Sequence, residues 1–324
     1  MKAIVVSNHG GPDVLEWRDH EAGAPGAGQV RIRHEAVGLN FIDVYFRTGL
    51  YAAPNGLPLV PGNEGAGVVV ALGEGVSDLK EGDRVAYAGP IGAYAQERVI
   101  AADQLVKVPD AIDLDTAAGM MLKGMTAEYL LRRTHRVEAG DTILFHAAAG
   151  GVGLIAGQWA KALGATVIGT VGSEEKAELA RANGYDHVIN YRTEDFVARV
   201  KDITGGKGVD VVYDSVGKDT FPGSLDCLRP RGLWASFGQS SGPIEPFNIG
   251  ILAQKGSLFA TRPTLFVYNA RRADLEQSAA ALFEVVANGT VRIGINQHYP
   301  LSDAARAHTD LEGRKTTGVT VLKP

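Results

Sequence analysis

Cysteine is nearly absent from this sequence, and so are long apolar runs and any excess of positive charge. The single cysteine, Cys227, cannot supply a disulfide framework or a four-cysteine metal site within the chain. It lies in an apolar stretch that we predict to be helical. We therefore expect an inert, buried thiol and a reducing compartment.

No stretch of about 18 apolar residues is present to span a membrane, and the N-terminus lacks the charged-then-apolar pattern of a secretory signal. The formal net charge of −5 gives no basic surface for nucleic acid. We therefore expect a cytoplasmic protein with neither a membrane nor a nucleic-acid partner. The 324 residues, 45% of them hydrophobic, are enough for two packed domains.

What the sequence does contain is a glycine turn typical of dinucleotide-binding proteins. The apolar run 141–145 predicts a buried strand, and the apolar spacing from Val152 to Gly164 predicts a helix. Between them, Ala148 takes the first position of the G-x-G-x-x-G pattern, and Gly150 and Gly153 take the second and third. We expect this turn to hold a pyrophosphate; a turn that merely connects strand to helix is the alternative.

The sequence after this turn alternates between predicted strands and helices. The predicted elements are Thr166–Val171, Glu174–Asn183, His187–Asn190, Glu194–Ile203, Val209–Asp214, Thr220–Leu228 and Leu233–Gly238. Such an alternation predicts a doubly wound parallel sheet with helices on both faces, and hence an α/β fold of the Rossmann type.

The end of the second predicted strand indicates which cofactor is preferred. An NAD site places a carboxylate about 20 residues after the first glycine, to bind the ribose hydroxyls. Here Gly172 and Ser173 follow the strand, with Lys176 one helical turn later and Tyr191 after the next strand. These groups suit a ribose phosphate and favour NADPH. The two glutamates after Ser173 are the counter-evidence, although carboxylates also suit the first turn of a helix.

The regions on either side of the predicted nucleotide-binding segment do not show this alternation of strands and helices. Short β-rich stretches separated by Gly and Pro precede it and predict a compact, largely antiparallel domain: Met1–Asn8, Val14–Arg18, Gln29–Val37, Gly67–Leu72, Arg84–Ala88 and Glu97–Ile100. A bridging helix from about Asp115 to Arg133, with Asp113 or Asp115 as N-cap, leads into the dinucleotide-binding strand.

The C-terminal region is expected to return to the first domain. It contains two predicted helices and a last strand, at Asp274–Asn288, Asp303–Leu311 and Gly318–Leu322. We therefore expect a catalytic domain at 1–122 and 265–324, interrupted by a nucleotide-binding domain at 123–264.

Several motifs together carry a family resemblance over nearly the whole chain. They are His9–Pro12, Val37–Asp43, Tyr51, Phe145–Gly153, Val212–Gly217, Ser236–Gly238 and Gly256–Phe259. With them the chain resembles the medium-chain dehydrogenase/reductase superfamily, in which a Rossmann domain interrupts a GroES-like, mainly β catalytic domain. Within that superfamily it looks like the NADPH:quinone oxidoreductases related to zeta-crystallin.

This resemblance also bears on zinc. Asn40 stands where zinc-dependent relatives have their first Cys ligand, and Asn63, between Gly62 and Glu64, stands where they have a His. Asparagine amides are poor ligands for Zn²⁺, so we expect no metal. The histidines are too scattered to suggest another site, and we expect surface or packing roles for all eight: His9, His20, His34, His135, His146, His187, His298 and His308.

Four residues are the candidates for catalysis. The resemblance implies that Asn40 to Tyr45 lie beside the nicotinamide, where the Asn40 amide would hold cofactor or acceptor and Tyr45 would pack against a ring. Tyr51 would stack on an aromatic acceptor or donate its hydroxyl to the reduced oxygen. Asp43 would take part in the reaction beside the nicotinamide or would only brace the loop. Packing or turn roles are the alternative for all four, because the spacing indicates no general acid.

The resemblance also implies a set of cofactor contacts. They are Asn40, Phe41, Tyr129, Ala149, Gly150, Gly151, Val152, Gly172, Ser173, Lys176, Tyr191, Ser215, Phe237, Gly238, Pro263 and Thr264, with Arg314 as a second cation for the phosphate. Lys123 and Thr126 on the bridging helix are further candidates to face the site, but for Lys123 we expect an ordinary solvated lysine.

Three functions remain open at this point. The first is NADPH-dependent reduction of quinones, by hydride or one-electron transfer. The second is a zinc-free enone or 2-alkenal reductase, and the third is a cofactor-binding protein with an RNA-binding or structural role. The apolar segments Leu233–Phe237 and Ser257–Thr261 are predicted strands late in the sheet, and an edge strand there would be unpaired unless covered, which favours a homodimer without excluding a tetramer. The sequence does not identify the physiological acceptor.

Overall fold

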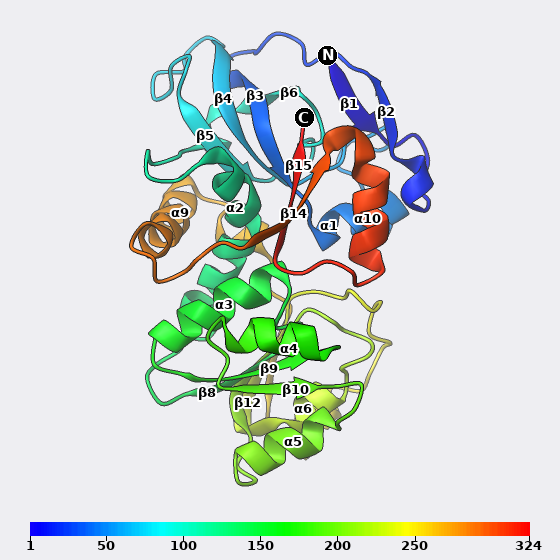
Figure 1. Cartoon of the computed structure of the whole chain (residues 1–324), viewed down its shortest axis with the longest axis vertical. Helices are drawn as coiled ribbons and strands as arrows, with labels where there is room; N and C mark the ends of the chain where they lie inside the picture. Colours follow the sequence, from blue (N-terminus) through cyan, green and yellow to red (C-terminus); the bar gives the residue numbers. More distant parts are fainter. The chain divides into compact units, whose positions relative to one another are not determined.

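The computed structural model describes residues 1–324 and divides the chain into two compact units. Unit 1 comprises Met1–Lys123, Arg272–Ala287 and Ile293–Pro324, and unit 2 comprises Gly124–Arg271 and Asn288–Arg292 (Figure 1). Helix α2 (Leu114–Tyr129) begins in unit 1 and ends in unit 2. Its N-cap is Asp113, whose carboxylate accepts the backbone N–H of Thr116 at 2.7 Å, so the first of the two predicted caps is the observed one.

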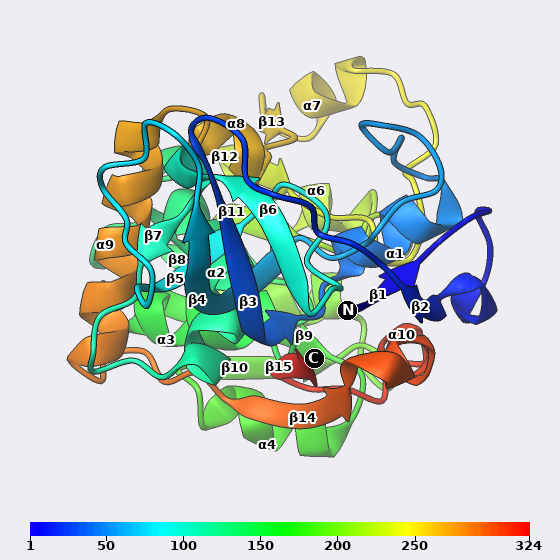
Figure 2. The ribbon, with the colours of Figure 1, turned by 90° about the horizontal axis from the view of Figure 1, so that it is seen from above.

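Unit 1 is built on a seven-stranded sheet with the order β14-β15-β3-β4-β5-β7, to which β6 adds by pairing with β3 (Figure 2). The strands are β3 (Gln29–Gly38), β4 (Glu64–Leu72), β5 (Arg84–Ala88), β6 (Glu97–Ala101), β7 (Val106–Lys107), β14 (Ile295–Pro300) and β15 (Val319–Lys323). A separate hairpin joins β1 (Lys2–Val5) to β2 (Glu16–Asp19). All pairs are antiparallel except β14 with β15, so the predicted largely antiparallel character is confirmed.

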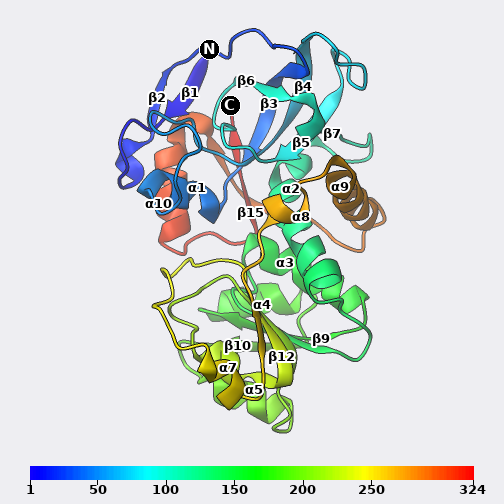
Figure 3. The same cartoon turned by 180° about the vertical axis from the view of Figure 1, so that it is seen from behind.

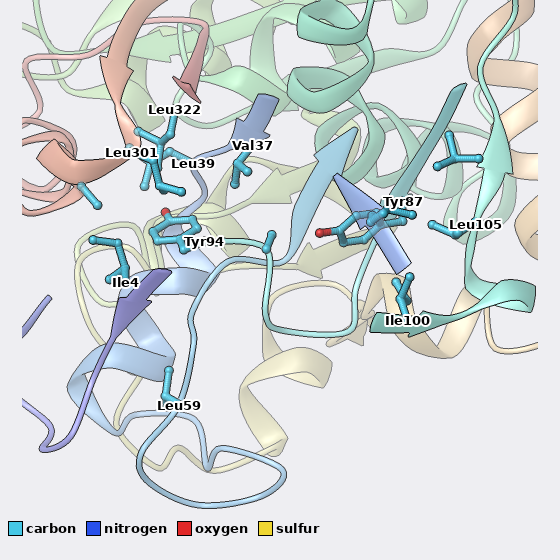
Figure 4. Packing of buried hydrophobic residues seen from close by; sticks show 14 of the residues in the cluster. Ile4, Val37, Leu39, Leu59, Tyr87, Tyr94, Ile100, Leu105, Leu301 and Leu322 are labelled. Atoms are coloured by element: carbon cyan, nitrogen blue, oxygen red, sulfur yellow. The ribbon is translucent and has the colours of Figure 1, made fainter. Parts of the chain in front are cut away.

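The core of unit 1 follows from the alternation of its strands. Val30, Ile32 and His34 of β3 are buried on one face, while Arg31 and Arg33 between them point outward. The packed cluster includes Ile4, Val37, Leu39, Leu59, Tyr87, Tyr94, Ile100, Leu105, Leu301 and Leu322 (Figure 4). Burying each of the large apolar side chains stabilises the fold by about 1.5–3 kcal/mol.

Three helices complete unit 1: α1 (Phe41–Thr48), α9 (Arg272–Ala287) and α10 (Ala304–Glu312). Helices α9 and α10 match the predicted ones, but neither α1 nor β14 was predicted. Helix α1 begins with a capping box, in which Asn40 is the N-cap and Asp43 accepts the Asn40 N–H, and it ends at Gly49 with a φ of 79°. The Arg47 side chain connects α1 to His308 and Glu312 of α10.

Unit 2 contains a six-stranded parallel sheet with the order β10-β9-β8-β11-β12-β13, which is the Rossmann order. Its strands are β8 (Thr142–Phe145), β9 (Thr166–Val171), β10 (His187–Asn190), β11 (Val209–Asp214), β12 (Leu228–Ser236) and β13 (Phe259–Thr261). Its helices are α3 (Gly151–Ala162), α4 (Glu174–Arg181), α5 (Phe196–Ile203), α6 (Gly223–Asp226), α7 (Gly250–Gln254) and α8 (Leu265–Tyr268). The doubly wound arrangement is confirmed, because α3 and α4 cover one face of the sheet and α5 and α6 the other (Figures 1 and 3).

One stretch of unit 2 differs from its prediction. The predicted helix Thr220–Leu228 is reduced to α6, and β12 already begins at Leu228, not at Leu233. Cys227 follows α6 directly. Its thiol is buried, as expected, and burial raises its pKa to about 12. None of the helices in the structure combines the length and the apolar character that a membrane span requires.

Candidate active site

Asn40 lies at the junction between β3 and α1, and both its backbone and its side chain are committed to carboxylates. Its backbone N–H donates to Asp43 Oδ2 at 2.9 Å, and its side-chain Nδ2 donates to Glu64 Oε2 at 2.8 Å. Asn40 is only 6% exposed, and both carboxylates are fully buried. Its amide oxygen faces the backbone N–H of Asp43 in the capping box at the start of α1.

Asp43 is the hub of this cluster. It accepts Asn63 Nδ2 on Oδ1 at 2.8 Å, and the Tyr94 hydroxyl on Oδ2 at 3.1 Å. Burial raises the pKa of Asp43 to about 6, although the hydrogen bonds from Asn63, Asn40 and Tyr94 oppose this effect. Since Asp43 does not reach the surface of the protein, its position fits the bracing role rather than direct contact with an acceptor.

A buried cation stands beside these amides. Lys123 Nζ lies 2.7 Å from Glu64 Oε2, the same oxygen that accepts the Asn40 amide, and the lysine is 5% exposed. The expectation of a solvated lysine was therefore wrong. The pairing was not visible in the sequence because Lys123 and Glu64 are 59 residues apart and belong to different elements.

A chain of hydrogen-bonded polar side chains connects Asp43 to α10. The Tyr94 hydroxyl contacts His308 Nε2 at 3.1 Å, and Arg47 donates to His308 Nδ1 at 3.0 Å and to both oxygens of Glu312. Burial and the Arg47 guanidinium lower the pKa of His308 to about 3, so this ring is neutral. Because Arg47 can only donate, Nδ1 is the acceptor and Nε2 carries the hydrogen.

Two predicted catalytic tyrosines lie together on and after α1. The rings of Tyr45 and Tyr51 are 5.1 Å apart, and Phe46 packs edge-on against Tyr51. The backbone N–H of Tyr51 donates to the Tyr45 carbonyl at 3.0 Å, which fixes the loop after the helix. The structure thus brings Asn40, Asp43, Tyr45 and Tyr51 onto one short segment of unit 1, with an aromatic cluster beside the polar one.

The cluster offers no set of acidic, Cys and His side chains for a metal. The side-chain amides of Asn40 and Asn63 are each hydrogen-bonded to a carboxylate, and the ammonium of Lys123 lies beside them. No group of three or more His, Cys, Asp or Glu side chains in the structure is arranged to hold a metal ion. The chemistry of these donors therefore suits hydrogen bonding to an organic acceptor better than Zn²⁺ coordination.

In unit 2 the glycine turn has the geometry that a pyrophosphate requires. Ala147 has a φ of 57°, and Gly150 caps α3, whose first N–H groups have no partner within the helix. A Cβ on Gly153 would lie 2.5 Å from the Ala147 carbonyl oxygen and 2.6 Å from that of Ala148. The absent side chain therefore lets α3 pack directly on the turn, with the N–H groups of Gly151 and Val152 at the positive end of the helix dipole.

Two of the residues proposed for the ribose phosphate, Ser173 and Tyr191, lie at the end of β9. Ser173 caps α4 by accepting the N–H of Lys176 at 3.3 Å, which leaves its hydroxyl hydrogen for a ligand. The Tyr191 hydroxyl is so close to Gly172 that a Cβ there would lie 2.5 Å from it. Tyr191 is 41% exposed. No carboxylate occupies the place of Ser173 at this strand end, where an NAD site would have one.

The remaining predicted contacts of unit 2 follow the carboxyl ends of other strands. Ser215 follows β11, Phe237 and Gly238 follow β12, and Pro263 and Thr264 come after β13. Asp214 braces two of these loops, because its carboxylate accepts the N–H groups of Val216 and Gly217 and its carbonyl oxygen accepts those of Phe237 and Gly238. In a parallel sheet these ends share one edge, where ligands of such folds bind.

Three predicted residues have a less direct placement. Tyr129 ends α2 and stacks on Tyr268, with ring centroids 4.5 Å apart. Ala149 is buried inside the turn, where its backbone is the part that a cofactor would meet. Arg314 belongs to unit 1, follows α10 and has a φ of 58°.

Comparison with known proteins connects both units to characterised relatives. Family models described as "Alcohol dehydrogenase GroES-like domain" and "Zinc-binding dehydrogenase" match residues 26–110 and 151–284. The chain is 56% identical to a quinone oxidoreductase of Pseudomonas aeruginosa and 50% identical to a 2-haloacrylate reductase of Burkholderia; each match covers 100% of this chain and 99% of the relative.

A solved structure extends this similarity to three dimensions. The crystal structure of the Escherichia coli quinone oxidoreductase complexed with NADPH matches with a TM-score of 0.98, at 50% sequence identity and over 100% of both chains. The similarity thus includes both the segment with Asn40 and the glycine turn.

Proposed function

We propose NADPH-dependent reduction of quinones for this chain, which belongs to the quinone oxidoreductase family of the medium-chain dehydrogenases/reductases. The family and the combination of a GroES-like with a Rossmann fold, both predicted from the sequence, are confirmed by these matches. The protein is thus an oxidoreductase, and its cofactor is NADPH.

One observation carries the proposal for the reaction: the amides of Asn40 and Asn63 are held by buried carboxylates and no metal-ligating set surrounds them. A bound Lewis acid assists the oxidation of an alcohol by stabilising the alkoxide. Reduction of a quinone needs less, since the acceptor delocalises the negative charge onto an oxygen that hydrogen-bond donors can stabilise.

The protein's own residues bind and orient the reactants. When bound, NADPH supplies the hydride equivalent. The N–H groups of Gly151 and Val152 would hold its pyrophosphate, and Ser173, Lys176 and Tyr191 its ribose phosphate.

At the reacting end, the Asn40 side chain would hold the nicotinamide carboxamide or the acceptor. Tyr45 and Tyr51 would provide a stacking surface for a planar acceptor, and the Tyr51 hydroxyl a donor to its oxygen. Asp43 would keep Asn40 in place. The remaining residues proposed for the cofactor, including Tyr129, Pro263 and Arg314, stay predictions.

A second candidate activity has its own support. The relative described as a 2-haloacrylate reductase is 50% identical over the full length, and an enone or alkenal is an electrophile of the same kind as a quinone. The RNA-binding or structural role has no supporting observation in the fold, and the net charge of −5 disfavours it.

The deciding experiment is steady-state oxidation of NADPH and NADH in parallel, with 1,4-benzoquinone and with a 2-alkenal as acceptors, after dialysis against a chelator. Chelator-resistant, NADPH-selective quinone turnover supports the proposal. A preference for the alkenal supports the second activity, and absence of turnover with every acceptor contradicts both.

We also propose a homodimer formed through β13, and a cytoplasmic location. Strand β13 pairs only with β12, so its other edge presents unpaired backbone groups. Phe259 on this strand is 61% exposed, and Ile249 and Val267 nearby in sequence are 76% and 74% exposed. An edge flanked by exposed apolar side chains is suited to pair with a second copy of the chain.

A further inference from the structure

We propose that Lys123 is the catalytic residue that donates the proton in this reduction, and that Glu64 holds its ammonium beside Asn40 for this purpose. The inference rests on the proposed function and deepens it, because the sequence offered no general acid. Lys123, Glu64 and Asn40 all belong to unit 1, so the argument uses the geometry of that unit alone.

The placement of the ammonium is the first step. Lys123 Nζ and Asn40 Nδ2 both donate to Glu64 Oε2, at 2.7 and 2.8 Å, and two donors on one oxygen necessarily lie close together. The ammonium therefore stands next to the side chain that, by its position in the sequence, replaces the first metal ligand of zinc-dependent relatives. A cation of the protein occupies the neighbourhood in which those enzymes use a metal.

The second step is that the fold is built to keep Glu64 in this position. Its Oε1 accepts the backbone N–H of Leu122 at 2.8 Å, so the residue before Lys123 is tied to the same carboxylate. Gly38 faces the carboxylate so closely that a Cβ would lie 2.3 Å from Oε2 and 2.4 Å from the Ala118 carbonyl oxygen. Only glycine leaves room for Glu64 here.

The third step concerns what the ion pair does. A buried ion pair of this kind contributes little net stability compared with apolar side chains of the same size, because desolvation offsets the attraction. An ammonium carries three N–H donors, and Glu64 is the only protein acceptor of Lys123. Two donors therefore remain for a bound molecule, within a site whose other groups, Asn40 and Tyr45, are proposed to meet the acceptor.

The chemistry balances with the groups named. The acceptor takes up a hydride equivalent from NADPH, which leaves as NADP⁺, and an oxygen of the acceptor becomes negative. An N–H bond of Lys123 breaks and an O–H bond forms on that oxygen. Lys123 is left as a neutral amine and regains its proton from water, so that each turnover consumes one NADPH, one acceptor and one proton.

The test is chemical rescue of Lys123→Ala. We expect quinone turnover to fall by about 100-fold or more, which is the range for loss of a general acid, while the Kd for NADPH, followed by its fluorescence, changes less than about threefold. Added methylamine or ethylamine should restore turnover in proportion to its concentration. Lys107→Ala is the matched control, because Lys107 is also paired with a carboxylate of unit 1 but is 58% exposed, and should keep full activity without a response to amines.

A second variant keeps the test valid if the alanine variant does not fold. Lys123→Arg preserves the positive charge, but a guanidinium does not release its proton, so we expect the same loss of turnover. Near-normal activity of Lys123→Arg, or of a folded Lys123→Ala, would overturn the inference while leaving the proposed function intact. A folded alanine variant that loses activity without amine rescue would also overturn it. Wild-type protein without any turnover would overturn both.

Discussion

Asn63 donates its side-chain amide to Asp43 across 2.8 Å, in a place where neither residue is more than 1% exposed. The contact connects the start of β4 to the first turn of α1. Since Asp43 also accepts the Asn40 N–H, the position of Asn40 depends on this carboxylate. Hydrogen bonds thus hold the side chains of Asn40 and Asn63 in place, as a metal ion would hold its ligands.

A first prediction concerns the pH dependence of stability. Burial raises the pKa of Asp43 from its usual 3.8 to about 6, so the folded protein binds this proton more tightly than the unfolded chain does. The contribution of protonated Asp43 to the free energy of unfolding is fully present below pH 3.8 and is lost as the pH rises through 6. It amounts to about 3 kcal/mol.

Asp43→Asn removes this titration. The free energy of unfolding of the wild type, measured relative to the variant in urea, should therefore increase by up to about 3 kcal/mol between pH 7.5 and pH 4. The exposed residue Asp103 provides the control variant Asp103→Asn, for which no such trend is expected. A constant difference between wild type and Asp43→Asn over this range would contradict the assignment.

A second prediction separates the two glycines of the dinucleotide turn. Gly153→Ala would drive a Cβ to within 2.6 Å of two backbone oxygens and push α3 away from the turn. We expect NADPH binding to weaken by at least about tenfold and stability to fall by about 1–3 kcal/mol. Gly150→Ala is the comparison, because its Cβ would meet the Ala147 carbonyl oxygen at 3.1 Å and Gly150 has a negative φ. The measurement is isothermal titration of both variants with NADPH. An equal loss of NADPH affinity in both variants would show that the close packing at Gly153 is not the cause.

Much of the fold could be predicted because its signals are local. Strands β9, β10 and β11 have the predicted bounds, and β9 is the mostly apolar run expected of a parallel strand covered on both faces. Strand β14 lacked such a signal, because it is half-exposed and polar. The early start of β12 was hidden by Pro230 and Gly232, which resemble a turn, and Arg231 between them has a φ of 61°.

The candidate site was predictable only where a short motif marks it. The glycine turn and the strand end at Ser173 are such motifs, and Asn40 and Asn63 stood out through the family resemblance. Lys123, Arg47 and His308 did not, because each acts through a partner far away in the sequence: Arg47 and His308, for example, are 261 residues apart. Only the folded chain shows that these side chains are buried and paired.

A third prediction tests the chain of hydrogen-bonded polar side chains that connects Asp43 to α10. Arg47 is 1% exposed and makes two hydrogen bonds to Glu312, so Arg47→Met removes the partner of Glu312 and of His308 Nδ1. We expect a loss of about 2–4 kcal/mol in the free energy of unfolding, measured in urea. Arg306→Met on α10 is the control, because Arg306 is 74% exposed and its ion pair with Asp310 is long, at 3.9 Å. Similar effects of the two substitutions would contradict the role of burial.

A fourth prediction concerns assembly. Phe259→Glu places a charge on the exposed side of β13, where a second copy of the chain would pair. We expect the sedimentation coefficient to change from that of a dimer to that of a monomer, with NADPH binding retained. Leu72→Glu, at the end of β4 in unit 1, introduces the same charge at a residue that is 38% exposed and should leave the dimer intact. A wild-type protein that sediments as a monomer would exclude this interface at once.

The last prediction distinguishes NADPH from NADH. The two cofactors differ only in the ribose phosphate, and the groups proposed to bind it are Ser173, Lys176 and Tyr191 at the end of β9. Lys176→Ala removes a charge-assisted hydrogen bond to that phosphate. The Kd for NADPH should increase by about 10- to 100-fold, equivalent to about 1.5–3 kcal/mol, whereas the Kd for NADH should be almost unchanged.

Lys161→Ala is the matched control for this measurement, because Lys161 is a half-exposed lysine of unit 2 whose partner is Asp186 on the protein itself. It should affect neither cofactor. If Lys176→Ala weakened both cofactors equally, Lys176 would act on the shape of α4 and not on the phosphate, and the preference for NADPH would have to come from Ser173 and Tyr191 alone. Raising the salt concentration should decrease the advantage of NADPH in the wild type and have little effect in Lys176→Ala, because screening weakens only the contact that the variant lacks.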